Sequence, residues 1–199
     1  RPPPRSTLLP YTTLFRSANT KFPNGLDRAS YAARIKEICD KSGMNICAYS
    51  IAGDFFQVDL PAEIERPKAD IGIARILGAP IMRTDIMDGF GSTGMSFDQC
   101  IKRVIPGLRE LADVASSQGI ILTTENHGRL FCESDRLEQL ISQVDHDHFR
   151  ILADLGNFVD ADEDCAYAVG RLAPWISHVH IKDFHIKPGD TIYPGEGWY

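Results

Sequence analysis

The chain has 199 residues, of which 43% are hydrophobic and 24% charged, and its net charge is −6. This length and composition are typical of one globular domain. An acidic surface binds the phosphates of nucleic acid poorly, and no apolar run approaches the roughly 20 residues that cross a bilayer. We therefore expect neither nucleic acid nor a membrane as a partner. The five cysteines are scattered without a C-x-x-C pair, which predicts reduced thiols in a cytoplasmic protein.

The two ends of the chain differ from the rest. Residues 1–17 are rich in Pro, Arg, Ser and Thr and contain no acidic residue. We interpret them as a non-native segment, with a natural disordered tail as the alternative, so that the domain covers residues 18–199. Residues 193–199 read as a turn followed by aromatic residues with nothing to pack against. This predicts that the natural protein is longer at both ends.

Apolar residues recur at helical spacing in five segments. The predicted helices cover 26–42, 61–77, the stretch from Ser96 to about Gln118, 135–144 and 162–172. Ser96 is a favourable N-cap for the third helix, and Gly43, Gly78 and Gly119 end the first three. Pro67 predicts a break or a late start in the second helix.

Five β-rich runs accompany these helices. They cover 45–52, 80–86 and the segments that lead to Glu125, Asp154 and His180. The order, an initial helix followed by βαβαβαβαβ, predicts an α/β fold in one domain: a parallel sheet with helices on its outside.

Each of the last three predicted strands ends in a residue type that binds metal ions. These residues are Glu125, Asp154 and His180, separated by 29 and 26 residues. That spacing fits one crossover through a helix to the next parallel strand. Parallel strands bring their C-terminal ends to one edge, so a Glu, an Asp and a His there predict a mixed oxygen and nitrogen site for a divalent cation.

Each of these residues also has a plain structural interpretation. The Glu125 carboxylate can be exposed to solvent without a functional role, and Asp154 can be a turn residue. Histidines are more often structural than functional. His178 and His180 alternate along one strand and so share a face. We assign His180, nearer the strand end, as the ligand and His178 as a deeper supporting group.

Three further patterns give weaker signals. The run Asp145-His146-Asp147-His148 contains ligand types, but it is predicted to be a solvated loop at the opposite end of the sheet. Residues 89–94 fit G-x-G-x-x-G, yet the acidic residue of the next strand lies 31 residues further on rather than about 20. A loop over the site is therefore the better interpretation. Arg83 either binds an anionic or hydroxyl-rich substrate or forms a salt bridge at the edge of the core.

Together these segments resemble the xylose isomerase-like superfamily of TIM barrels, which includes sugar phosphate isomerases and epimerases. The resemblance covers roughly residues 22–199. It rests on four motifs: TENHG at 124–128, DLGN at 154–157, HVHIKD at 178–183 and PGEG at 194–197. It implies an eight-stranded barrel that binds one metal through a Glu, an Asp, a His and a second Glu from four successive strands. Glu125, Asp154 and His180 match the first three. It therefore implies a partial TIM (β/α) barrel of about five parallel strands with outer helices, in which the first two strands and the last strand are missing.

The same resemblance implies a metal-dependent isomerase or epimerase that acts on a small sugar or sugar phosphate by proton transfer through an enediolate. Glu125 and the second Glu would exchange the proton. The implied substrate contacts are Arg83, His127, Asn157, His178 and Lys182. The implied cofactor is Mn²⁺ or Mg²⁺, with Co²⁺ or Zn²⁺ as alternatives.

Other functions stay open. A dehydratase or lyase acting on a keto-polyol could use the same metal. The apurinic-site endonuclease branch shares the fold, but its multinuclear zinc site with more histidines fits this acidic chain less well. An inactive fragment or a carbohydrate-binding module is the non-enzymatic alternative, because an open sheet of five strands does not close a barrel. The sequence leaves the sugar, its phosphorylation and a homo-oligomeric state undetermined.

Overall fold

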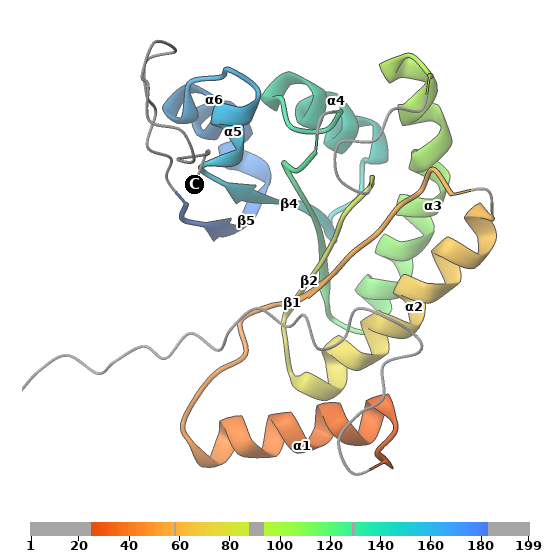
Figure 1. Cartoon of the computed structure of the whole chain (residues 1–199), viewed down its shortest axis with the longest axis vertical. Helices are drawn as coiled ribbons and strands as arrows, with labels where there is room; N and C mark the ends of the chain where they lie inside the picture. The colour runs from red at the N-terminus through yellow and green to blue at the C-terminus, as the bar shows by residue number, and fades with distance from the viewer. Residues whose placement is uncertain (1–24, 58, 88–93, 129, 183–199) are drawn as a thin grey trace, which may run out of the picture.

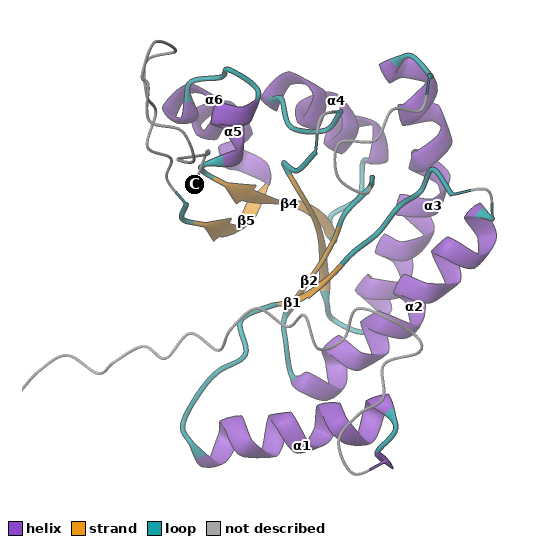
Figure 2. Ribbon diagram, viewed as in Figure 1, coloured by secondary structure: helices purple, strands orange, loops and turns teal. Residues whose placement is uncertain are grey.

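The computed structural model describes residues 25–57, 59–87, 94–128 and 130–182. The predicted tail at 1–17, the loop at 89–93 and the motif at 194–197 lie outside these residues. In the described part, five parallel strands form one sheet in chain order (Figures 1 and 2). They are β1 (Tyr49–Ile51), β2 (Ile81–Thr84), β3 (Ile121–Glu125), β4 (Phe149–Asp154) and β5 (Ile176–His180). The predicted α/β fold is confirmed, and the described residues make up part of a barrel.

Helices precede and connect the strands and pack against one another in chain order. The long ones are α1 (Arg28–Lys41), α2 (Leu60–Leu77), α3 (Phe97–Ser117), α4 (Ser134–Val144) and α6 (Cys165–Leu172). Helix α1 packs on α2, α2 on α3, α3 on α4 and α4 on α6 (Figure 1). All five correspond to predicted helices. The short helix α5 (Asn157–Asp160) and the 3₁₀ turn η3 (Ala173–Trp175) were not predicted, because pieces this short carry no periodicity.

Pro67 does not interrupt α2, so the prediction of a break or late start is wrong. The helix is continuous over Leu60–Leu77. A proline in a helix interior removes one N–H donor and costs about 3 kcal/mol. However, α2 buries Ile71, Ala74 and Leu77 in the core. Tertiary packing of this kind outweighs intrinsic propensity.

Helix α3 shows how the sequence pattern becomes packing. The predicted N-cap forms a full capping box, because Gln99 N donates to Ser96 Oγ and Ser96 N donates to Gln99 Oε1. The predicted apolar stripe faces the core, where Ile101, Val104 and Leu108 are fully buried. Helix α3 thereby packs against β3 and β4 along the outer side of the sheet.

Two bulk predictions can be compared with the structure. In the described part of the chain, no helix combines the length and apolar character needed to cross a membrane. The five cysteines are free thiols, of which Cys39, Cys100 and Cys132 are buried. The cytoplasmic location stays a prediction.

Candidate metal centre

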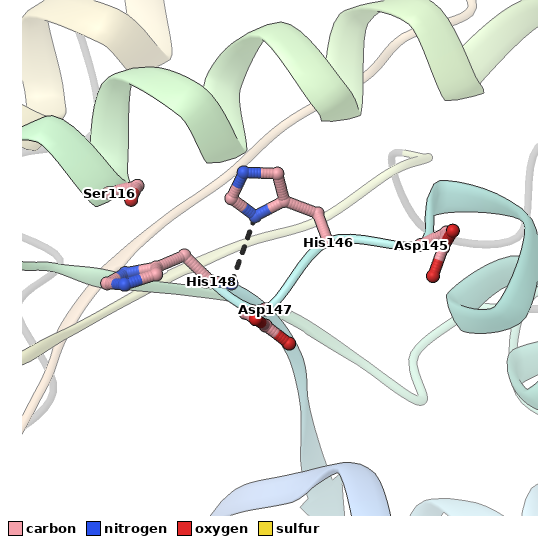
Figure 3. A pocket seen from close by; sticks show the side chains of 5 residues that line it. All are labelled: Ser116, Asp145, His146, Asp147 and His148. Carbon is pink, nitrogen blue, oxygen red and sulfur yellow. Dashed lines mark hydrogen bonds between the residues drawn. The ribbon is translucent and has the colours of Figure 1, made fainter.

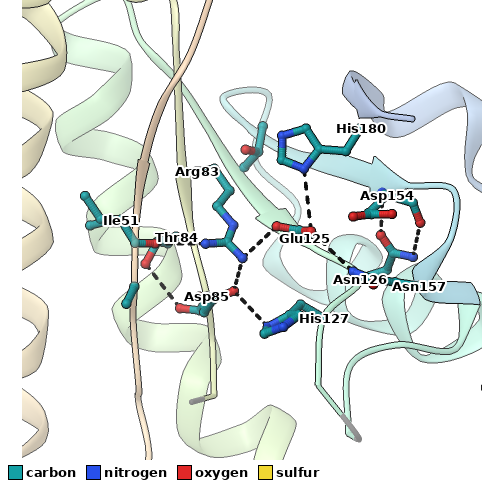
Figure 4. Close-up of polar contacts among 12 residues, drawn as sticks. Ile51, Arg83, Thr84, Asp85, Glu125, Asn126, His127, Asp154, Asn157 and His180 are labelled. Carbon is teal, nitrogen blue, oxygen red and sulfur yellow. Dashed lines mark hydrogen bonds and ion pairs between the residues drawn. The ribbon is translucent and has the colours of Figure 1, made fainter. Parts of the chain in front are cut away.

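Strands β3, β4 and β5 end side by side, and each ends in one of the predicted ligands (Figure 4). In the register of the sheet, Asp154 lies opposite His180. One ligand atom each from Glu125, Asp154 and His180 lies within 4.8 Å of the other two. The fold thus brings the three side chains together, while their role as metal ligands stays a prediction.

The three side chains are largely buried from solvent. Glu125 and Asp154 are 7% and 8% exposed, and His180 is 17% exposed. Burial raises the pKa of the Glu125 carboxyl, but the contact with His180 and the positive charge of Arg83 outweigh it and lower the pKa to about 2. Glu125 is therefore ionised at neutral pH, as a metal ligand must be.

Neighbouring residues hold both the backbone and the carboxylate of Asp154 in place. The buried Asn126 side chain donates to the Asp154 carbonyl at 2.9 Å and accepts from the Asp154 N–H at 2.7 Å. The N–H of Gly156 donates to Asp154 Oδ1 at 3.0 Å, and Lys182 Nζ lies 3.5 Å from Oδ2. These contacts join the end of β3 to the end of β4 and set the direction of the Asp154 carboxylate.

Three of the predicted substrate contacts lie beside the candidate ligands. Asn157 Nδ2 donates to Glu125 Oε1 at 3.3 Å, and Lys182 donates to the Asn157 side-chain carbonyl. The ring of His178 shares a face of β5 with that of His180, with centroids 5.4 Å apart. Burial and the neighbouring His180 lower the pKa of His178. The structure places all three at the site, and their contact with a substrate stays a prediction.

The other two predicted substrate contacts, Arg83 and His127, meet at Asp85. Arg83 Nη2 lies 2.6 Å from Glu125 Oε2 and also donates to Asp85 Oδ1. Arg83 thus forms a salt bridge with both carboxylates, and its contact with a substrate stays a prediction. Asp85 Oδ1 also lies 3.4 Å from His127 Nδ1, and this carboxylate raises the pKa of His127 despite its partial burial.

Asp85 and Asn126 belong to the site but had no predicted role. Asp85 lies two residues after Arg83, and strand alternation could have placed it on the same face. Nothing in the local sequence shows that the Asn126 side chain bonds to the end of β4. The buried Cys132 also lies beside the site. Its thiol donates to the Asn157 carbonyl at 2.8 Å, and burial raises its pKa to about 12.

The donor set fits a divalent cation. Two carboxylates and one imidazole combine hard oxygen ligands with one nitrogen, a set suited to Mn²⁺ or Mg²⁺, with Co²⁺ or Zn²⁺ also accommodated. Glu125 Oε1 faces His180 Nδ1 at 3.6 Å, while Arg83 occupies Oε2. A carboxylate already turned toward its neighbours in this way loses little freedom when it binds an ion.

The run Asp145-His146-Asp147-His148 lies in the loop before β4, at the opposite end of the sheet, as predicted (Figure 3). With Ser116 it lines a cavity of about 530 Å³. The backbone engages both rings, since His148 N donates to His146 Nδ1 and His148 Nδ1 donates to the Ile120 carbonyl. Among the described residues, the side chains of this run do not form a group with three ligand atoms close enough together to hold one metal ion.

Comparison with known proteins identifies the family. The family model described as xylose isomerase-like TIM barrel matches residues 13–199. The chain therefore belongs to this family. Residues 13–17 of the predicted tail fall within the match, and the assignment of a tail stays a prediction.

Two curated relatives and one solved structure give the range of similar proteins. The 2-epi-5-epi-valiolone 7-phosphate 2-epimerase of Actinoplanes sp. is 26% identical over 170 residues, which are 83% of this chain and 59% of that protein. The inosose dehydratase of Geobacillus thermodenitrificans is 27% identical over 90 residues, which are 45% of this chain and 30% of that protein. The chain thus spans less than two thirds of either relative.

The solved structure is a xylose isomerase-like TIM barrel protein from Mycobacterium smegmatis in complex with magnesium. It superposes with a TM-score of 0.62 at 22% identity, over 78% of this chain and 56% of that one. This likeness supports the fold described above.

Proposed function

We propose that this chain carries the metal-binding part of an isomerase or epimerase that moves a proton on a small carbohydrate. The observation that carries the proposal is the convergence of Glu125, Asp154 and His180 within 4.8 Å at the C-terminal ends of three parallel strands. Chemistry in barrels of this kind sits at that end. The epimerase relative supports the same class of reaction.

The proposed cofactor is Mn²⁺ or Mg²⁺, and a bound cation would polarise a substrate carbonyl as a Lewis acid. Glu125 is the proposed proton acceptor at the adjacent carbon. Its pKa of about 2 keeps the carboxylate ionised at neutral pH, as both the ligand role and the proton-acceptor role require. Asn157, Lys182 and His127 are proposed to hold substrate hydroxyls or a phosphate. The cytoplasmic location and a homo-oligomeric state stay predictions.

A dehydratase is the second candidate, and the inosose dehydratase relative favours it. Both reactions begin with removal of a proton beside a carbonyl. An epimerase returns a proton to that carbon, whereas a dehydratase expels a hydroxyl from the next one. The appearance of an unsaturated ketone would therefore separate the two.

Exchange of substrate C–H for solvent deuterium tests the proposal. We expect the purified protein to exchange the hydrogen beside the carbonyl of a keto-pentose, a keto-hexose or an inosose with Mn²⁺ present, and not in EDTA. Glu125→Gln should lose most of this exchange, because an amide can offer an oxygen ligand but cannot accept the proton. The matched control Asp147→Asn, at a fully exposed carboxylate, should keep it. Full exchange in EDTA would contradict the metal dependence, and normal exchange by Glu125→Gln would contradict the assigned base. No exchange with or without Mn²⁺ would favour the binding-module alternative.

A further inference from the structure

Polar contacts of Arg83 join three neighbouring strands (Figure 4). Arg83 lies on β2, its Nη1 donates to the carbonyl of Ile51 on β1 at 3.3 Å, and its Nη2 lies 2.6 Å from Glu125 Oε2 on β3. The same Nη2 donates to Asp85. The side chains of Arg83, Asp85 and Glu125 are 12%, 11% and 7% exposed. One largely buried guanidinium therefore bridges two buried carboxylates.

Asp85 is held in place independently of its carboxylate. Phe55 N donates to the Ile86 carbonyl at 2.8 Å and so fastens the loop after β1 to the backbone beside Asp85. Gly53, in the same loop, lies so close that a Cβ there would stand 2.2 Å from the Asp85 carbonyl oxygen. The Asp85 backbone is therefore packed tightly against this loop, which limits how far the residue that carries the carboxylate can move.

We infer that Asp85 is a positioning residue that acts through Arg83 to fix the carboxylate of Glu125. By anchoring Arg83, it keeps Glu125 Oε2 engaged and leaves Oε1 toward His180 at 3.6 Å and Asn157 at 3.3 Å. A residue that contacts the side chain of a metal ligand without binding the metal sets the orientation of that ligand and supports the affinity for the metal. The inference rests on the proposed cation site.

The shape of these groups matters as well as their charge. The planar fork of arginine can bond two carboxylates and a carbonyl at once, whereas lysine offers a point charge on a flexible stem. Arg83→Lys therefore keeps the charge and loses the bridge. Asp85→Glu also keeps the charge but moves the carboxylate by one methylene. A change in cation affinity in either variant reports geometry rather than long-range attraction.

Titration of Mn²⁺ into the 199-residue chain by isothermal calorimetry tests the inference. We expect Arg83→Lys and Asp85→Glu each to bind Mn²⁺ about 10-fold more weakly than wild type. The double variant should bind about as weakly as either single one, because both act through the same contact. Asp147→Glu, at a fully exposed side chain at the other end of the sheet, is the matched control and should bind like wild type.

The melting temperature of each metal-free variant checks that it folds. If Asp85→Glu does not fold, the nearly isosteric Asp85→Asn replaces it. This variant also removes a negative charge, so its loss is compared with that of Arg83→Lys, which keeps the charge. Wild-type Mn²⁺ affinity in the folded variants, or additive losses in the double variant, would overturn the positioning role alone. A wild-type chain that binds no Mn²⁺ would overturn the proposed function and this inference together.

Discussion

The two ends of the sheet contain the same residue types in very different arrangements. At one end, Asp145-His146-Asp147-His148 places four ligand-type side chains next to one another in sequence, yet Asp147 is fully exposed and the backbone engages both rings. At the other end, Glu125, Asp154 and His180 are far apart in sequence and meet within 4.8 Å in a buried place. A dense run of ligand-type residues in the sequence therefore does not bring three ligand atoms within reach of one another, whereas the convergence of separate strand ends does.

Acid unfolding should distinguish the two ends most strongly. The Glu125 pKa is lowered from 4.5 to about 2 in the folded chain, so its ionised form stabilises the fold above pH 4.5, and this contribution is lost as the pH falls toward 2. The loss is on the order of 3 kcal/mol. Urea unfolding of the metal-free chain from pH 6 to 2 should show it in wild type and in Asp147→Asn, and not in Glu125→Gln. Equal pH dependence in wild type and Glu125→Gln would contradict the ion pairing at the site.

Each end of the sheet also has a side chain that joins β3 to β4, and their removal should have unequal effects. Asn126 makes two bonds to the Asp154 backbone in a fully buried place. Asn126→Ala leaves those backbone groups unsatisfied and should lower the free energy of unfolding by about 2–3 kcal/mol. His148 makes one such bond, to the Ile120 carbonyl, so His148→Ala should lower it by about 1 kcal/mol. Urea denaturation measures both, and equal losses would contradict the difference in burial.

The smallest effect is expected at the exposed contact between His146 Nε2 and Asp113 Oδ1. Their nearest atoms are 3.3 Å apart, and the Asp113 side chain is 76% exposed. Pairs of this kind contribute little because solvent screens them. Thermal unfolding of Asp113→Asn should reveal a change below about 0.5 kcal/mol. A loss several times larger would show that the Asp145–His148 loop is a built structure rather than a solvated connection.

The sequence predicts the ligand cluster well because a simple rule governs it. Parallel strands joined by crossovers present their C-terminal ends at one edge, so Glu125, Asp154 and His180 could be placed together without side-chain detail. The orientation of Arg83 could not be predicted in the same way. It depends on two carboxylates, Asp85 and Glu125, on different strands, and both interpretations of Arg83 satisfied the local pattern.

Local rules failed where tertiary contacts decide the structure. Pro67 should interrupt a helix, but the burial of Ile71 and Leu77 holds α2 together. Asn126 looks like an ordinary loop residue, and its role appears only when the end of β4 is placed beside it. Both outcomes come from contacts between segments that lie apart in the sequence, which no single-segment pattern contains.

Mn²⁺ binding to the wild-type chain and to two aspartate variants, one at each end of the sheet, is the most direct test of the central claim. We predict that the wild-type chain binds one Mn²⁺ and that Asp154→Asn binds it at least about 100-fold more weakly. Asp147→Asn, which removes a charge from the opposite end, should bind like wild type. Undiminished binding by Asp154→Asn, or a comparable loss in Asp147→Asn, would contradict the claim that Glu125, Asp154 and His180 form the cation site.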